Sequence, residues 1–222
     1  MREHLRNCFE QWGLPKALRV DNGDPWATRS DVPSALALWL IGLGVKVLLN
    51  RPYQSTDNAI VERGHGVLAK WVEAHHARDR QALQKQMDWA IRMQRERYPA
   101  CEGQARILAH PQLLSNPRLY SRQDEERLWD FERVLSFLAE KLWTRRVDKI
   151  GRISLFSSDY SVGRAYTGQD VHIHLDPQSH QWVFETEQGL LLKRYDCLEI
   201  SPERIDNFLL TKRAYPVSHS SA

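Results

Sequence analysis

The order of apolar and polar residues in the first fifty positions predicts a strand, a helix and a second strand. Leu18 and Val20 belong to a short β-rich run that turn residues close. The nearly all-apolar stretch 35–41 predicts a helix that begins with a cap at Asp31, and the stretch 45–49 predicts a buried strand. In this order the connection is almost always right-handed and the strands are parallel.

Two acidic residues, Asp21 and Glu62, flank this strand–helix–strand segment. Asp21 follows the first strand, and Glu62 lies near the start of residues 58–76, where apolar side chains recur at helical spacing. Because ligands bind at the carboxyl ends of parallel strands, a role for Asp21 in binding is expected. Taken alone, Glu62 is also explained as an ordinary first-turn acid that the helix dipole favours.

Two phrases around these acids resemble the second half of the catalytic core of DDE integrases and transposases. They are Arg19-Val20-Asp21-Asn22-Gly23 with Pro25-Trp26, and Asn50-Arg51-Pro52-Tyr53-Gln54 leading into Asn58-Ala59-Ile60-Val61-Glu62-Arg63. The resemblance implies a ribonuclease H-like fold in which three acidic residues bind two divalent metal ions. It makes Asp21 and Glu62 the second and third of these catalytic, metal-binding acids.

The first aspartate of the family and the three strands around it have no counterpart in this sequence. The residues before Asp21 predict only one helix, over residues 2–13. We therefore expect a partial ribonuclease H-like core, truncated at the N-terminus, whose remainder comes from an adjoining reading frame, from sequence ahead of a start site placed too late, or from a separate polypeptide. Mg²⁺ (or Mn²⁺) is expected as cofactor only with that N-terminal part present, so whether this chain is an enzyme by itself is left open.

The later parts of the chain predict a helical region followed by short strands, so the fold class is α/β plus all-β. The core is expected over residues 1–78 and a helical linker over 79–144. From residue 145 the apolar period changes from 3.6 to 2, and short strands over 145–200 predict a small β-barrel. It resembles the SH3-like C-terminal barrel of Mu-type transposases. Residues 201–222 are expected to form a short helix and a disordered tail.

Candidate DNA contacts come from both regions of the chain. By their position in the family phrase, Asn58 and Gln54 are candidates for contacts either to DNA or to the shell around the metal. Arg63 and Lys70 follow on the predicted helix. A solvated helix face explains Arg63 and Lys70 nearly as well. In the predicted barrel the candidate phosphate contacts are Arg145, Arg146, Lys149 and Arg152, for which solvated strand faces are an equal alternative.

Composition and charge bear on the partners of the protein and on its cellular compartment. A formal net charge of +3 does not by itself imply nucleic acid, although residues 63–106 carry nine Lys and Arg against five acids. The three cysteines show neither disulfide nor zinc spacing, which indicates a reducing compartment. No apolar run is long enough for a membrane span and no signal peptide opens the chain, so we expect a cytoplasmic protein without a membrane partner.

Three functions remain open at this point. The first is a transposase or integrase fragment that cleaves and joins DNA at element ends and target, with DNA and further copies of itself as partners. The second is an inactive DNA-binding remnant of a transposable element. The third is a ribonuclease H-like nuclease unrelated to transposition, which would leave the C-terminal strands without an evident use.

Overall fold

The computed structural model describes residues 1–28, 32–51, 55–116 and 118–210. The chain forms two compact units. Unit 1 comprises Met1–Asn7, Pro15–Leu49 and Tyr120–Ala222, and unit 2 comprises Cys8–Leu14 and Asn50–Leu119. These boundaries differ from the ranges 1–78 and 79–144 expected from the sequence. Within the described residues, no helix has the length and apolar character needed to cross a membrane.

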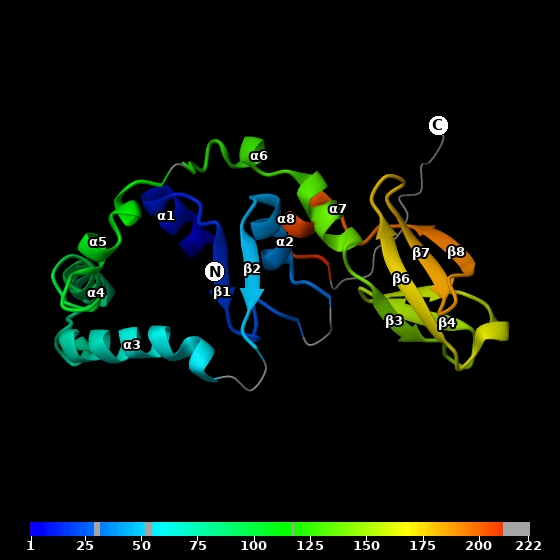
Figure 1. The fold of residues 1–222 in the computed structure, drawn as a ribbon, viewed down its shortest axis with the longest axis horizontal. Coiled ribbons are helices and arrows are strands. Elements are labelled where there is room, and N and C mark those ends of the chain that lie inside the picture. The colour runs from blue at the N-terminus through cyan, green and yellow to red at the C-terminus, as the bar shows by residue number, and fades with distance from the viewer. Residues whose placement is uncertain (29–31, 52–54, 117, 211–222) are drawn as a thin grey trace. The chain divides into compact units, whose positions relative to one another are not determined.

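The predicted strand–helix–strand segment lies in unit 1 and is present as β1 (Ala17–Val20), α2 (Ala35–Gly42) and β2 (Lys46–Leu49) (Figure 1). The two strands pair in parallel along their whole length, as their order predicted. Helix α2 is almost entirely buried, and Leu38 and Leu40 have no exposed surface. Its apolar sequence on all sides reflects this position.

Helix α2 begins at a serine cap. The hydroxyl of Ser34 accepts a hydrogen bond from the backbone N–H of Ala37 at 3.1 Å and donates one to the carbonyl oxygen of Trp26 at 2.9 Å. The cap predicted at Asp31 lies outside the described residues. Ser34 satisfies one of the backbone donors that the first turn of a helix leaves open.

Gly42 ends α2 against an indole ring. A Cβ at this position would lie 2.1 Å from Trp129 Nε1, whose N–H donates to the carbonyl oxygen of Trp39 at 3.1 Å. We expect Gly42→Ala to lower the free energy of unfolding by about 1–3 kcal/mol, because the ring must move and the hydrogen bond must lengthen. Urea unfolding measures the change.

Gly64 provides the matched control for this substitution. It lies inside a helix of unit 2, and a Cβ there would meet nothing within 4 Å. Gly64→Ala is expected to raise the free energy of unfolding by about 0.5–1 kcal/mol through helix propensity alone. If Gly42→Ala unfolds at the wild-type urea concentration, the packing of α2 on Trp129 is not as described.

Three further helices accompany α2 in unit 1. They are α6 (Glu125–Leu128), α7 (Phe131–Ala139) and α8 (Pro202–Asp206), and both α7 and α8 contact α2. A break at Trp129 separates α6 from α7. The carboxylate of Asp130 accepts a hydrogen bond from Glu132 N at 2.9 Å, and this cap starts α7 anew.

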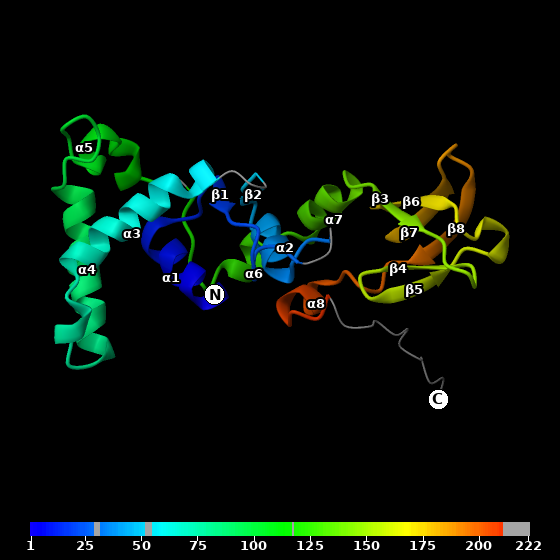
Figure 2. The ribbon, with the colours of Figure 1, turned by 90° about the horizontal axis from the view of Figure 1, so that it is seen from below.

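The strands after residue 142 form two antiparallel sheets. The four-stranded sheet has the order β3-β6-β7-β8, and the two-stranded sheet is the hairpin β4-β5. Figure 2 shows the hairpin lying against one face of the larger sheet. The bounds are β3 (Trp143–Arg146), β4 (Arg152–Leu155), β5 (Ser158–Ser161), β6 (Asp170–Asp176), β7 (Gln181–Thr186) and β8 (Leu191–Asp196).

The two sheets do not close into the small barrel predicted over 145–200. In the described residues, no strand pairing connects the hairpin with the larger sheet. Aromatic side chains fill the space between them instead: the Trp182 ring centroid lies 5.5 Å from that of Trp143 and 5.6 Å from that of Phe156. Alternation of apolar residues specifies the buried face of each strand but not the pairing at its edges, so the prediction of a closed barrel was wrong.

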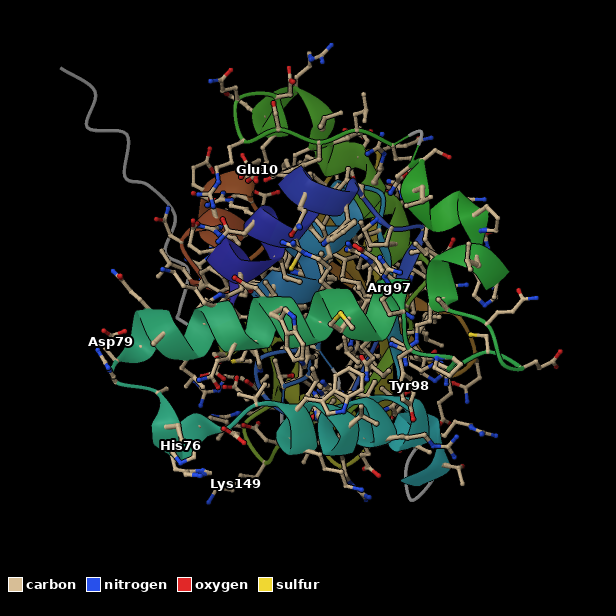
Figure 3. All side chains as sticks on the ribbon, turned by 90° about the vertical axis from the view of Figure 1, so that its left-hand side faces the viewer. Glu10, His76, Asp79, Arg97, Tyr98 and Lys149 are labelled. Atoms are coloured by element: carbon tan, nitrogen blue, oxygen red, sulfur yellow. The ribbon has the colours of Figure 1, made fainter. Side chains whose placement is uncertain are left out.

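Unit 2 is helical. Its helices are α3 (Ala59–Trp71), α4 (Arg80–Glu96) and α5 (Arg106–Ala109), and residues 8–12 of α1 (Arg2–Trp12) belong to the same unit. Figure 3 shows α3 and α4 side by side, with Asp79 and Arg97 at the two ends of α4. The carboxylate of Asp79 caps α4 by accepting a hydrogen bond from Ala82 N at 2.8 Å. The helix predicted over 2–13 is confirmed as α1.

Candidate functional site

Asp21 lies directly after β1 in unit 1, as the sequence predicted. Its side chain is exposed, and its Oδ1 accepts a hydrogen bond from the backbone N–H of Gly23 at 3.3 Å. This local bond turns the chain away from the strand, a conformation that Asp and Asn favour. The carboxylate therefore faces solvent at the carboxyl end of a parallel strand.

Glu62 lies on the first turn of α3 in unit 2, again as predicted. Its side chain is exposed. The open backbone N–H groups at the start of a helix favour negative charge, so this carboxylate and a bound anion are both stabilised there. Asp21 and Glu62 belong to different units, and their convergence on one site stays a prediction.

Asn58 precedes α3 and makes a contact that the sequence did not reveal. Its Oδ1 accepts a hydrogen bond from Asn50 Nδ2 at 2.6 Å, and Asn50 is buried. This bond ties the start of the 50–58 segment to its end, just before the helix that carries Glu62. The other amide predicted to contact DNA, Gln54, lies outside the described residues.

The predicted cations of unit 2 lie on α3. Lys70 is exposed in the last turn of the helix, and Arg63 is exposed near its start. Arg63 also lines a pocket between α3 and residues 94–110. Neither side chain forms an ion pair among the described residues, so both charges are available to an anionic partner.

The four predicted cations of unit 1 lie on β3, on β4 and in the turn between them, but they are not equivalent. Arg145 donates from Nε to the carbonyl oxygen of Ser154 at 3.3 Å and from Nη1 to that of Thr144 at 2.9 Å. Arg152 lies between two carboxylates, each 3.9 Å away: its Nε from Asp148 Oδ2 and its Nη1 from Asp159 Oδ2. Of these four side chains, Arg146 and Lys149 are exposed and form no ion pair among the described residues, so their charges are open to an anionic partner.

Single substitutions test whether Arg146 and Lys149 contribute more to DNA binding than Arg152 does. Arg146→Gln and Lys149→Gln are each expected to weaken duplex DNA binding and to reduce the slope of log K against log salt by about 0.9, the effect of one lost phosphate contact. Arg152→Gln is expected to change the slope much less, because Asp148 and Asp159 already oppose its charge. Fluorescence anisotropy over a salt series measures both. Equal effects of all three variants would contradict the assignment.

The donor atoms at Asp21 and Glu62 are of the type that Mg²⁺ prefers, namely carboxylate oxygens. In the described part of the chain, however, no group of three or more His, Cys, Asp or Glu side chains is placed to hold a metal ion. No model of a known protein family matches this chain. The assignment of these two carboxylates therefore rests on their sequence phrases and on their positions beside β1 and in α3.

Two clusters were not visible to sequence reasoning. In unit 1, Glu125 accepts hydrogen bonds from Arg6, Trp39 and Tyr120. In unit 2, Arg106 donates to buried Gln94 at the edge of the pocket that Arg63 lines. Both clusters join residues of different helices that share no sequence motif. No local pattern could therefore have indicated them.

Proposed function

We propose that this chain is the C-terminal part of a DDE-type transposase with a ribonuclease H-like core. One observation supports the proposal: each of the two acids that the family phrases identify lies at the position in the fold that the family expects. The Asp-Asn-Gly phrase places Asp21 at the carboxyl end of β1 in a parallel strand–helix–strand segment, and the later phrase places Glu62 on the first turn of the helix that follows β2. DNA at the element ends and at the target would be its substrate.

The chemistry assigned to these residues is metal-dependent phosphoryl transfer. Asp21 and Glu62 would hold Mg²⁺ through their carboxylate oxygens, together with a third carboxylate that this sequence does not supply. When bound, the metal activates a water or a DNA 3′-hydroxyl and stabilises charge on the phosphate under attack. The chain's other residues position the nucleic acid: Asn50 holds Asn58 ahead of α3, and Arg146 and Lys149 would contact backbone phosphates.

A second candidate function needs no metal. The exposed charges of Arg146, Lys149 and Arg63 support DNA binding whether or not the carboxylates act. On this alternative the chain is a DNA-binding remnant of a transposable element, and Asp21 and Glu62 have no catalytic role.

The DNA immediately upstream of the Met1 codon distinguishes the two candidates. If it is translated in all frames, the transposase proposal predicts three β-patterned runs with an aspartate in the first, either in frame or reachable by a frameshift. Stop codons or unrelated sequence in every frame would contradict the catalytic proposal and favour the DNA-binding remnant.

A further inference from the structure

Unit 2 contains a pocket of about 590 Å³ whose lining is basic. It lies between α3, the end of α4 and the segment that leads into α5. The described lining residues include Arg63, Arg106 and His110 but no Asp or Glu. Its volume falls in the range of small-molecule sites, which is roughly 300–1,000 Å³. An anion entering this pocket would meet positive charge without an opposing carboxylate.

Arg106 is held in place by a neutral partner. Its Nη1 donates a hydrogen bond at 3.0 Å to Oε1 of Gln94, and Gln94 is only 7% exposed. Within the described part of the chain, Arg106 and Arg63 form no ion pair. A carboxylate partner would have cancelled the charge of Arg106, whereas the amide fixes its direction and leaves the charge intact. Fixed arginine groups are well suited to phosphate oxygens.

The same pocket has an aromatic wall. Tyr98 lines it beside Pro99, and its ring makes a T-shaped contact with that of Trp71 at a centroid distance of 5.3 Å. Tyr98 remains 39% exposed, and Figure 3 places it just past Arg97 at the end of α4. The contact with Trp71 steadies the ring, and the exposed part of Tyr98 is accessible to a flat ligand. Arginine charges beside an aromatic ring are the combination that binds single-stranded nucleic acids.

We propose that this pocket binds one nucleotide of a single-stranded nucleic acid, with the phosphate held by Arg63 and Arg106 and the base stacked on Tyr98. A base inside a duplex is already stacked on its neighbours and cannot enter a pocket, so a single strand is the matching ligand. The inference goes beyond the proposed function, because it requires neither a metal ion nor catalysis.

Fluorescence anisotropy with a labelled oligothymidylate of about four nucleotides tests the pocket on the whole chain. Arg63→Gln and Arg106→Gln are each expected to weaken binding about ten-fold. Each should also reduce the salt slope by about 0.7. Tyr98→Ala is expected to weaken binding about ten-fold through lost stacking, and Tyr98→Phe is expected to retain it. Arg92→Gln is the matched control, since it removes the same charge from the exposed surface of α4 outside the pocket lining.

Gln94→Glu adds a test that removes no positive side chain. The new carboxylate is nearly the same size and lies beside Arg106. It is expected to cancel that charge and to weaken binding about as much as Arg106→Gln does, about ten-fold, while circular dichroism and thermal unfolding show an intact fold. Unchanged binding by Gln94→Glu, or an equal loss with Arg92→Gln, would overturn the proposal.

Thymidine monophosphate and inorganic phosphate, used as competitors, separate the two sources of a nucleotide phosphate. Competition by thymidine monophosphate at the oligonucleotide's own affinity would identify a free nucleotide as the ligand and overturn the single-strand assignment. Much weaker competition by both supports it. Strand transfer that depends on Asp21 with no effect of the pocket variants would refute the pocket alone and leave the proposed function standing.

Discussion

Asp21→Asn and Glu62→Gln are each expected to reduce metal-dependent DNA strand transfer by at least about 1,000-fold, because under the proposed function each removes a charged metal ligand while keeping the size of the side chain. The measurement is the joining of a labelled DNA end to target DNA by the protein assembled with the third carboxylate. Duplex binding should stay at the wild-type level in both variants, since neither carboxylate contributes to phosphate attraction.

Substitutions of two other exposed acidic residues are the controls for the expected loss of strand transfer. Asp24→Asn removes a charge from the same exposed loop as Asp21, and Glu73→Gln removes one from unit 2, where it pairs with His76 at 2.9 Å. Both controls are expected to retain strand transfer. Activity in Asp21→Asn or Glu62→Gln, or an equal loss in a control, would refute the catalytic assignment.

Glu125→Ala is expected to destabilise unit 1 by about 3–5 kcal/mol, the cost of breaking a buried ion pair on one side. Arg6 donates to both carboxylate oxygens, from Nη2 at 2.6 Å and from Nε at 2.8 Å. Trp39 Nε1 donates to Oε1 at 3.2 Å, and the hydroxyl of Tyr120 donates to Oε2. The Glu125 side chain is 14% exposed, so its loss leaves all three donors poorly solvated. Urea unfolding measures the change.

The neighbouring glutamate is the control for this variant. Glu126 lies on the same helix with an exposed side chain, and Glu126→Ala is expected to change the free energy of unfolding by less than about 0.5 kcal/mol. A Glu125→Ala protein as stable as Glu126→Ala would show that the network around Glu125 contributes nothing.

The same network makes the stability of unit 1 depend on pH. Burial alone would raise the pKa of Glu125, but the hydrogen bonds from Arg6, Tyr120 and Trp39 outweigh it, so the folded pKa lies below its ordinary value. The ion pair therefore stabilises the folded state fully at pH values above the unfolded pKa of about 4.3. This stabilisation is lost as the pH falls through the lower folded pKa. The difference in stability between wild type and Glu125→Ala should shrink between pH 7 and pH 3.

Local patterns in the sequence were sufficient for the strand–helix–strand segment. Turn residues located the end of β1, and apolar runs located α2 and β2, because these signals depend on neighbours along the chain. The burial expected for β2 was wrong, since Leu49 is 49% exposed. The same reasoning placed Asp21 after β1 and Glu62 on the first turn of α3. Asp21 lies at the end of a strand and Glu62 at the start of a helix, and turn residues and helix-start residues indicate such positions well.

Contacts between distant residues could not be predicted. Nothing near Arg106 indicates that it reaches Gln94, and nothing near Glu125 indicates that Arg6 reaches it. The sequence likewise did not indicate that Arg152 has acidic neighbours. The carboxylate of Asp159 approaches Arg152 only because β4 and β5 pair. These features depend on how elements pack, and the apolar pattern does not encode that packing.

Metal-directed cleavage of the protein assembled with the third carboxylate tests most directly whether Asp21 and Glu62 share one divalent ion. Fe²⁺ in place of Mg²⁺, with ascorbate and peroxide, generates hydroxyl radicals at the bound ion that cut the nearby backbone. We predict cuts near both residue 21 and residue 62, with both sets lost in Asp21→Asn and in Glu62→Gln and both retained in Asp24→Asn. Cuts at only one of the two positions, or cuts that persist in both variants, would contradict a shared metal site.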